Sequence, residues 1–268
     1  MKPDSINVWL GQTPNASEHG GLVDHMLGFV HWFMLVLFIG WTTYLVIAFW
    51  RFRSTKNKRA DYHGFRGHAT THVEIGVAIV EAILLLGFAF PLWAHQADEY
   101  PTSPDTIRLR ALGEKFLWNF QYPGTDMMLS TWHLSNVDGA TNTTGKDLHD
   151  PNGKDDFVNP TTLKLPVGRP VIVDVATKDV IHNLAIVPMR AAQDATPGVK
   201  SHMWFKPIKK GSWDIICGQL CGPGHAQMKA NLEVVDAKEY DDWAAEQSAA
   251  ALKKTTDAAA AAPKPAAH

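Results

Sequence analysis

The chain has 268 residues, with 25 basic and 27 acidic side chains, so its formal net charge is −2. This length leaves room for more than one structural unit. The balanced charge argues against a nucleic-acid-binding protein, because such proteins carry a basic surface. Ten tryptophans and twelve phenylalanines are many for a soluble domain of this size, and several of them flank or fill two long apolar runs.

The two apolar runs, residues 26–50 and 75–94, are each long enough to cross a membrane. A hydrocarbon core of about 30 Å needs roughly 20 residues at about 1.5 Å each. Trp50 and Trp93 lie at ends of these runs, where aromatic side chains favour the membrane interface. We predict a transmembrane helical hairpin over residues 22–98 rather than two buried helices of a soluble core, because little else in the chain could cover them.

The segment between the runs, residues 51–71, is strongly basic. It holds six arginine or lysine side chains against one acid, Asp61. Loops rich in positive charge stay in the cytoplasm, so both termini are expected on the periplasmic side of a bacterial inner membrane. Residues 1–21 would then be an extracytoplasmic tail, and they lack the basic start and short apolar core of a cleaved signal peptide.

Residues 99–236 carry the pattern of an extracytoplasmic β domain. Short apolar or alternating runs are separated by Gly, Pro, Asn and Asp, which is typical of strands joined by turns and favours a sandwich or barrel. The polar residues 135–160 predict a long surface loop. The runs expected to form strands include residues 107–112, 162–167, 170–177, 182–187 and 230–235.

The C-terminal part, residues 237–268, combines two patterns. Residues 236–254 suit a surface helix, and the alanine-rich residues 255–268 are of low complexity and predict a disordered tail. The predicted fold class is therefore an α+β membrane protein, in which a helical hairpin precedes an extracytoplasmic β domain.

The stretch CGQLCGPGHAQM, residues 217–228, contains the only two cysteines of the chain. A disulfide is the simplest interpretation in an oxidising compartment, but it gives no reason for His225 and Met228 so close behind Cys221. Thiolate, imidazole and thioether are the ligands that soft copper prefers, whereas zinc makes little use of methionine. Glycines and a proline also allow backbone carbonyls to approach a metal, so we predict a copper site.

One more ligand is expected from elsewhere, and His182 is the best candidate because it lies at the end of a predicted strand. Two thiolates with two imidazoles favour two coppers, since a mononuclear blue-copper site uses one cysteine. Cys217 and Cys221 can each bridge both metals, with His182 and His225 on different coppers. Met228 and a backbone carbonyl would be weak axial ligands. Such a centre suits electron transfer and offers no open position for a substrate.

These residues resemble subunit II of the haem-copper respiratory oxidases, cytochrome c oxidase in particular. The family pattern Cys-x-x-x-Cys-x-x-x-His-x-x-Met falls on Cys217, Cys221, His225 and Met228, and its Asp-Val-x-His segment on residues 179–182. The resemblance implies a cupredoxin-like β-sandwich or barrel with a binuclear CuA centre. It also implies electron transfer from a cytochrome c, or from a cytochrome c-containing complex, to haem in subunit I, where oxygen is reduced to water. Other oxidase subunits and membrane lipid are the further partners that it implies.

The resemblance assigns a role to each matching residue. The copper ligands would be His182, Cys217, Cys221, His225, Met228 and the backbone carbonyl of Gln219. The family often has glutamate in place of Gln219, and that side chain helps to hold a magnesium ion at the border with subunit I. Because Gln219 is neutral, the magnesium site is an open question while the copper role is not.

Three further residues match positions near the donor side of the family's copper centre. The family has a tryptophan through which electrons are proposed to arrive, and this position is occupied by Phe116 here. Trp118 lies two residues further and is expected on the same strand face. Core packing explains both aromatic residues equally well. Asp179 falls where the family has an acid near the docking face, and acids there would steer a basic donor.

Two glutamates lie in the second apolar helix. Glu74 falls where the family has a glutamate at the cytoplasmic mouth of a proton path, although a plain interfacial residue is an equal alternative. Glu81, seven residues later, shares its helix face. A carboxylate is costly in lipid, so Glu81 is expected to contact subunit I, with proton transfer as the weaker alternative.

Three other functions compete with the oxidase subunit. A nitric oxide reductase can use the same copper subunit, because the gas is handled in subunit I. A membrane-tethered copper carrier would bind one exchangeable ion, which the two-thiolate, two-imidazole set disfavours. A quinol oxidase subunit would keep the fold without the ligands, all of which are present. The chain has no CxxCH motif and hence no fused cytochrome c.

Overall fold

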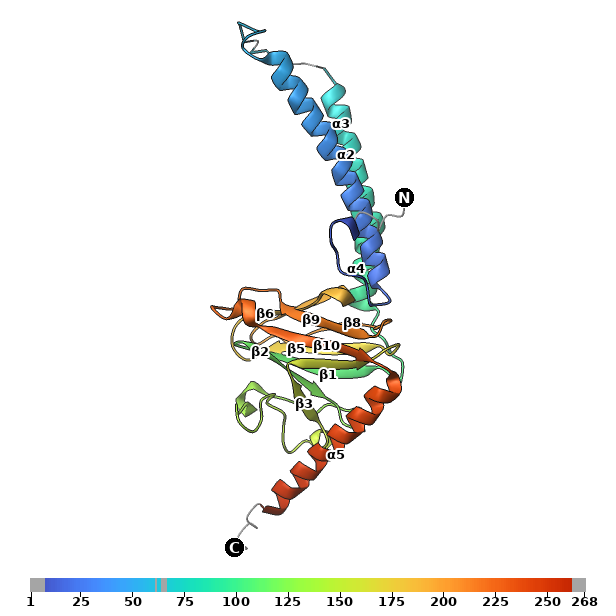
Figure 1. Ribbon diagram of the computed structural model, residues 1–268, viewed down its shortest axis with the longest axis vertical. Helices are drawn as coiled ribbons and strands as arrows, with labels where there is room; N and C mark the ends of the chain where they lie inside the picture. The colour runs from blue at the N-terminus through green and yellow to red at the C-terminus, as the bar shows by residue number, and fades with distance from the viewer. Residues whose placement is uncertain (1–7, 61, 64–66, 262–268) are drawn as a thin grey trace. The chain divides into compact units, whose positions relative to one another are not determined.

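The computed structural model describes residues 8–60, 62–63 and 67–261, and these fall into two compact units (Figure 1). One unit contains residues 8–14 and 21–98, and it includes the apolar helices. The other contains residues 15–20 and 99–261 and includes all of the strands in the described residues.

The helical unit consists of two long helical segments, both apolar and long enough to cross a membrane. The first is α2 (Gly20–Phe52), and the second runs through α3 (Ala69–Leu84), the π-helical turn η1 (Leu85–Ala89) and α4 (Phe90–Asp98). Pro91 gives a reason for the wider turn, because a proline lacks the N–H that an α-helix needs and its ring clashes with the carbonyl four residues earlier. Both predicted runs lie inside these segments.

The β unit consists of two five-stranded sheets. Their strand orders are β3-β2-β1-β5-β8 and β4-β10-β9-β6-β7. The pairs β1–β5 and β4–β10 are parallel, and the other strand pairs are antiparallel. The strands are β1 (Ile107–Glu114), β2 (Leu117–Tyr122), β3 (Phe157–Pro160), β4 (Thr162–Pro166), β5 (Val171–Thr177), β6 (His182–Ile186), β7 (Ala191–Ala195), β8 (Ser201–Phe205), β9 (Gly211–Cys217) and β10 (Lys229–Val235).

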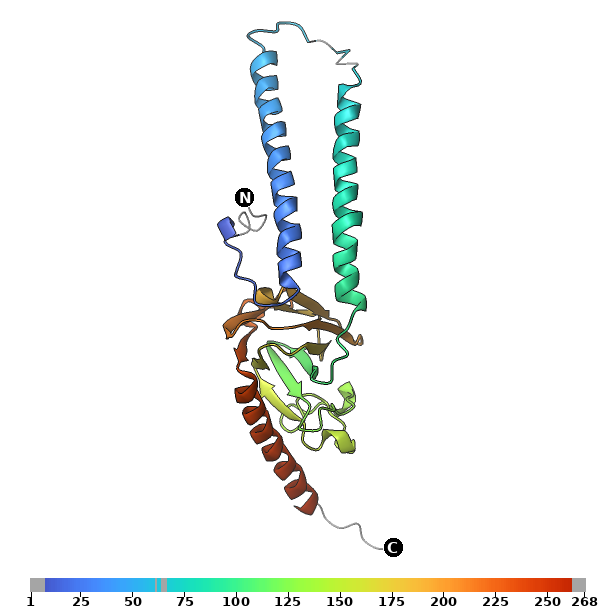
Figure 2. The same ribbon diagram turned by 90° about the vertical axis from the view of Figure 1, so that its right-hand side faces the viewer.

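The two sheets pack their apolar faces against each other. Leu109 and Val173 from one sheet and Leu184 and Leu232 from the other are fully buried in a single cluster. Alternation along the strands produces this, because every second side chain points to the same face. β2 is an exception, since its residues after Leu117 are buried on both faces. The segment 123–156, here called the β2–β3 loop, gives the reason, because it covers the outer face of β2 (Figure 2).

Two predictions about non-strand segments were wrong in part. Residues 135–160 were expected to be loop throughout, but Phe157–Pro160 form β3 and pair with β2. The sequence FVNP at residues 157–160 gives only a weak strand signal, because it is short and contains asparagine and proline. The predicted helix over 236–254 is the longer α5 (Ala237–Ala261), so the expected disorder is wrong for residues 255–261, where alanine favours a helix. Residues 262–268 lie outside the described residues.

Candidate metal centre

The predicted ligands come from three strands whose ends meet at one end of the β unit. His182 is the first residue of β6, Cys217 is the last residue of β9, and Met228 directly precedes β10. β6 and β9 are paired so that Leu184 lies opposite Cys217. The Cys217 N–H donates to the Met228 carbonyl at 3.2 Å, and the Gly218 N–H donates to the Asn183 carbonyl at 3.0 Å. The backbone therefore holds the ligand loop at both of its ends.

The two sulfur atoms lie 3.9 Å apart, and both cysteines are free. A disulfide would bring them to about 2.05 Å. Each sulfur has a different imidazole beside it: Cys217 Sγ lies 3.9 Å from His182 Nδ1, and Cys221 Sγ lies 3.7 Å from His225 Nδ1. The ligand atoms of His182, Cys217 and Cys221 all lie within 4.8 Å of one another.

The remaining predicted ligand atoms complete the cluster. Met228 Sδ lies 3.7 Å from Cys221 Sγ, and the Gln219 carbonyl oxygen lies 3.2 Å from Cys217 Sγ. His182 is fully buried, Cys217, Cys221 and Met228 are buried, and His225 is half-buried. Burial raises the pKa of the Cys221 thiol, and the adjacent Cys217 sulfur raises it further. Two soft thiolates with imidazoles and a thioether fit copper.

Asp179 supports the His182 imidazole. Its Oδ1 lies 2.9 Å from His182 Nε2, which leaves Nδ1 directed to Cys217. Partial burial raises the pKa of the Asp179 carboxyl, but hydrogen bonds from His182 and from the backbone N–H groups of Lys115 and Val180 outweigh this and lower it. A carboxylate behind a ligating histidine fixes the ring and its tautomer. The Asp-x-x-His spacing could have predicted this contact, which the sequence analysis missed.

The prediction that Phe116 and Trp118 share a strand face is wrong, because Trp118 lies on β2 whereas Phe116 lies in the turn between β1 and β2. Trp118 is fully buried and meets His182 edge-on, with ring centroids 5.9 Å apart. Phe116 is half-buried and lies on the backbone of the ligand loop at Gly222 and Gly224. Both aromatic side chains therefore pack directly beside predicted ligand segments, and Phe116 is the more accessible of the two.

Gly224 leaves the space that Phe116 fills. A Cβ atom at residue 224 would lie 2.4 Å from Phe116 Cδ2. Gly224→Val is therefore expected to destabilise the β unit by about 1–3 kcal/mol, the usual cost of overpacking, and to displace the ring. Thermal unfolding measures the first effect. Gly139→Ala is the matched control, because a Cβ there meets nothing within 4 Å; equal losses in both variants would contradict the packing explanation.

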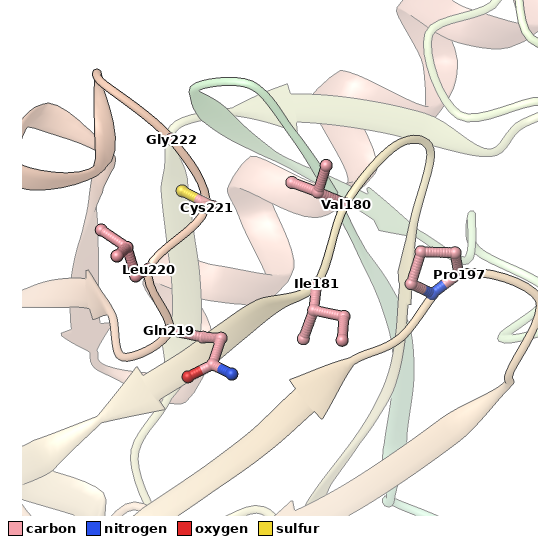
Figure 3. A pocket seen from close by; sticks show the side chains of 7 residues that line it. All are labelled: Val180, Ile181, Pro197, Gln219, Leu220, Cys221 and Gly222. Carbon is pink, nitrogen blue, oxygen red and sulfur yellow. The ribbon is translucent and has the colours of Figure 1, made fainter.

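A shallow hollow opens beside Cys221 (Figure 3). Leu220 is 81% exposed and Ile181 41% exposed, and the Gln219 side chain lies next to them. The complete lining is Val180, Ile181, Pro197, Gln219, Leu220, Cys221 and Gly222. None of these side chains is a carboxylate, so this face by itself offers a magnesium ion only the neutral amide of Gln219.

Glu74 and Glu81 both lie in α3, in the helical unit, and both are exposed. The sequence predicted a shared helix face, and the continuous α-helix from Ala69 to Leu84 keeps that spacing. Within the described part of the chain, neither carboxyl group forms a hydrogen bond or ion pair.

A two-sheet β domain that gathers two cysteines, two histidines and a methionine at one end defines a class of protein, the cupredoxin-like β domains. The comparisons with known proteins agree. The family described as cytochrome C oxidase subunit II, periplasmic domain, matches residues 107–235.

Several relatives align over most of the chain. The alternative cytochrome c oxidase subunit 2 of Bradyrhizobium diazoefficiens is 30% identical over 237 residues, covering 88% of this chain and 83% of that protein. Cytochrome c oxidase subunit 2 of Cereibacter sphaeroides is 26% identical over 248 residues, covering 87% and 78%. The solved periplasmic domain of subunit II of cytochrome oxidase from Bradyrhizobium japonicum is 27% identical, covers 58% of this chain and 98% of that one, and has a TM-score of 0.40.

The chain belongs to the cytochrome c oxidase subunit II family. It is thus a membrane-anchored protein with an extracytoplasmic domain, and part of an oxidoreductase family.

Proposed function

We propose that this chain is the subunit of a cytochrome c oxidase that receives electrons from a cytochrome c and passes them to haem in subunit I. The observation that carries the proposal is the geometry of the sulfur pair. The two sulfurs are 3.9 Å apart, and each lies beside a different histidine nitrogen. Thiolates bind such metals at about 2.3 Å, so sulfurs 3.9 Å apart are close enough for Cys217 and Cys221 to hold the same metal centre.

The residues that would hold two copper ions are His182, Cys217, Cys221, His225, Met228 and the Gln219 carbonyl. When bound, such a pair supplies a one-electron carrier. The chain contributes the rigidity: β-sheet hydrogen bonds hold both ends of the loop, and Asp179 holds the His182 ring. Burial of the sulfurs and of His182 keeps water away from the ligands.

We propose that each of the two units contacts subunit I. In the bacterial inner membrane, the helical unit with Glu74 and Glu81 would contact subunit I, with Glu74 at the mouth of a proton path and both chain termini on the periplasmic side. The hollow beside Gln219 and Leu220 would face subunit I near its haem. Without a carboxylate in that hollow, any magnesium ion at the border would depend on partner residues.

The experiment that tests this proposal is electron paramagnetic resonance of the full chain in its oxidase complex, together with oxidation of a reduced cytochrome c. A hyperfine pattern of one electron shared over two copper nuclei, with cytochrome c oxidation, is expected. A single-copper spectrum with exchangeable metal would instead favour the carrier. Nitric oxide reduction without oxygen reduction would favour the reductase, which shares this subunit's chemistry.

The donor side is proposed to lie near Phe116, Trp118 and Asp179. Residues 132–134 of the β2–β3 loop lie beside Thr177 in this region, and the loop holds two lysines and six aspartates, of which all but the buried Asp156 are at least partly exposed. An acidic surface attracts a basic donor. At 0.1 M salt this attraction is largely screened at distances beyond about 10 Å. We expect kcat/KM for a basic cytochrome c to fall as ionic strength rises above 0.1 M, while kcat at saturating donor stays constant. Stopped-flow kinetics measures this, and a rate independent of salt would contradict acidic docking.

A further inference from the structure

A buried polar cluster lies away from the metal ligands, beneath the β2–β3 loop. Its members are Arg110 on β1, Gln121 on β2, and Ser130 and Asp156 in the loop, and we call these four side chains the Arg110 cluster. Each is at most 5% exposed. The sequence pattern does not distinguish these four residues, because residues of these types are usually exposed.

Hydrogen bonds connect the Arg110 cluster from the sheet to both parts of the loop. Arg110 donates from Nη1 to Gln121 Oε1 at 2.9 Å and from Nη2 to the Ser130 carbonyl at 3.1 Å. Gln121 Nε2 donates to Asp156 Oδ2 at 2.7 Å. The same oxygen accepts from the Ser130 N–H at 3.0 Å and from Ser130 Oγ at 2.7 Å. Two loop residues 26 positions apart are therefore tied to each other and to the sheet.

The charges of this cluster are costly to bury. Burial lowers the pKa of Arg110 to about 10, so the guanidinium stays charged at neutral pH, and burial raises the pKa of Asp156. Buried ionic groups add little net stability compared with well-packed apolar side chains. The buried charges of Arg110 and Asp156 are therefore better explained by a role in holding the loop in one arrangement than by a contribution to stability.

The β2–β3 loop, fixed in this way, lies beside the segment that orients the predicted ligand His182. Residues of the loop and of the β5 and β8 ends together line a cleft: Trp132, His133, Leu134, Ala176, Thr177, Gly198, Val199 and Lys200. Trp132 contacts two cations, with Arg110 Cζ 5.3 Å and Lys200 Nζ 5.4 Å from its ring centroid. Arg110 thus contacts the cleft as well as the loop.

Thr177, which lines this cleft, connects it to His182 through Asp179. Thr177 Oγ1 donates to the Val180 carbonyl at 2.8 Å and lies 3.4 Å from Asp179 Oδ1. Asp179 Oδ1 in turn lies 2.9 Å from His182 Nε2. Residues 132–134 of the loop are therefore held next to the segment that orients a metal ligand.

We propose that the Arg110 cluster positions the β2–β3 loop as a docking surface for the basic electron donor, and that Arg110 and Asp156 are positioning residues. This inference rests on the proposed function. It predicts an effect on donor binding without an effect on the metal ligands, because no member of the cluster lies in the ligand set.

The test uses Arg110→Gln in the complete oxidase. We expect faster amide hydrogen exchange in residues 123–156 and a KM for reduced cytochrome c that rises several-fold. The kcat at saturating donor and the paramagnetic resonance spectrum should not change. Arg108→Gln is the matched control: Arg108 lies two residues away on β1, is exposed, and pairs with Asp174 rather than with the loop. It should leave loop exchange unchanged.

A milder variant protects the test against misfolding. Ser130→Ala removes the hydroxyl bonds to Asp156 and Gln121 but keeps the backbone N–H, so it is expected to fold and to loosen the loop less than Arg110→Gln. Unchanged loop exchange in both variants would overturn the anchoring role. A looser loop with an unchanged KM would overturn the docking role. Failure of the proposed function would show separately, as a wild-type complex that oxidises no cytochrome c.

Discussion

Replacing Cys217 or Cys221 by serine is expected to abolish the two-copper spectrum and electron uptake from cytochrome c. Each sulfur lies beside a different imidazole and 3.9 Å from the other sulfur, so neither can replace its neighbour. A hydroxyl is a poor ligand for soft copper. Paramagnetic resonance and stopped-flow reduction of the purified oxidase measure the two losses, and a surviving two-nucleus pattern in either variant would refute sulfur bridging.

Two control variants separate the ligand effect from folding. Ala230→Ser adds a hydroxyl at a buried residue of β10 without removing a sulfur atom, and it should keep the two-copper spectrum. Met228→Leu removes the thioether that lies 3.7 Å from Cys221 Sγ. Because a thioether would be a weaker copper ligand than a thiolate or an imidazole, this variant should keep two coppers and change the reduction potential, which potentiometry measures.

Replacing Trp118 by alanine is expected to destabilise the β unit by about 3–5 kcal/mol, the usual cost of removing a buried aromatic side chain. Trp118 is fully buried, belongs to the main core and meets the edge of His182. At about 2–4 °C per kcal/mol for a unit of this size, the melting temperature should fall by roughly 6–20 °C. Calorimetry of the full chain in detergent measures this change.

The comparison with Trp118→Phe shows how the side chain acts. Within the described residues, Trp118 Nε1 has no hydrogen-bond acceptor, so phenylalanine loses packing volume but no such bond. It should cost much less stability than alanine. If electron uptake by the oxidase falls sharply in Trp118→Phe while stability and the copper spectrum are kept, the indole takes part in electron transfer as well as packing.

Much of the site could be predicted from the sequence, for a physical reason. Cys217, Cys221, His225 and Met228 lie within twelve residues, so a short loop brings them together wherever it folds, and their ligand types select the metal. The two apolar helices were equally predictable, because membrane crossing depends on length and composition. Strands with clear alternation, such as β1 and β5, were found for the same local reason.

Other features were decided by tertiary structure alone. The contact of Asp179 with His182 depends on the turn between β5 and β6. The contact of Phe116 with Gly224 depends on two connecting segments from different sheets, the β1–β2 turn and the β9–β10 loop. β3 has almost no signal of its own and exists because β2 offers it an edge. A strand whose propensity is weak is fixed by its partners.

The Arg110 cluster shows most clearly which features cannot be predicted from the sequence. Residue types determine what a site can bind, and at residues 217–228 the sequence determined this by itself. Whether Arg110, Gln121 and Asp156 lie in water or inside the protein was decided only when the β2–β3 loop folded over β2. Burial of a polar side chain requires partners from distant parts of the chain, and only the tertiary structure brings those partners together.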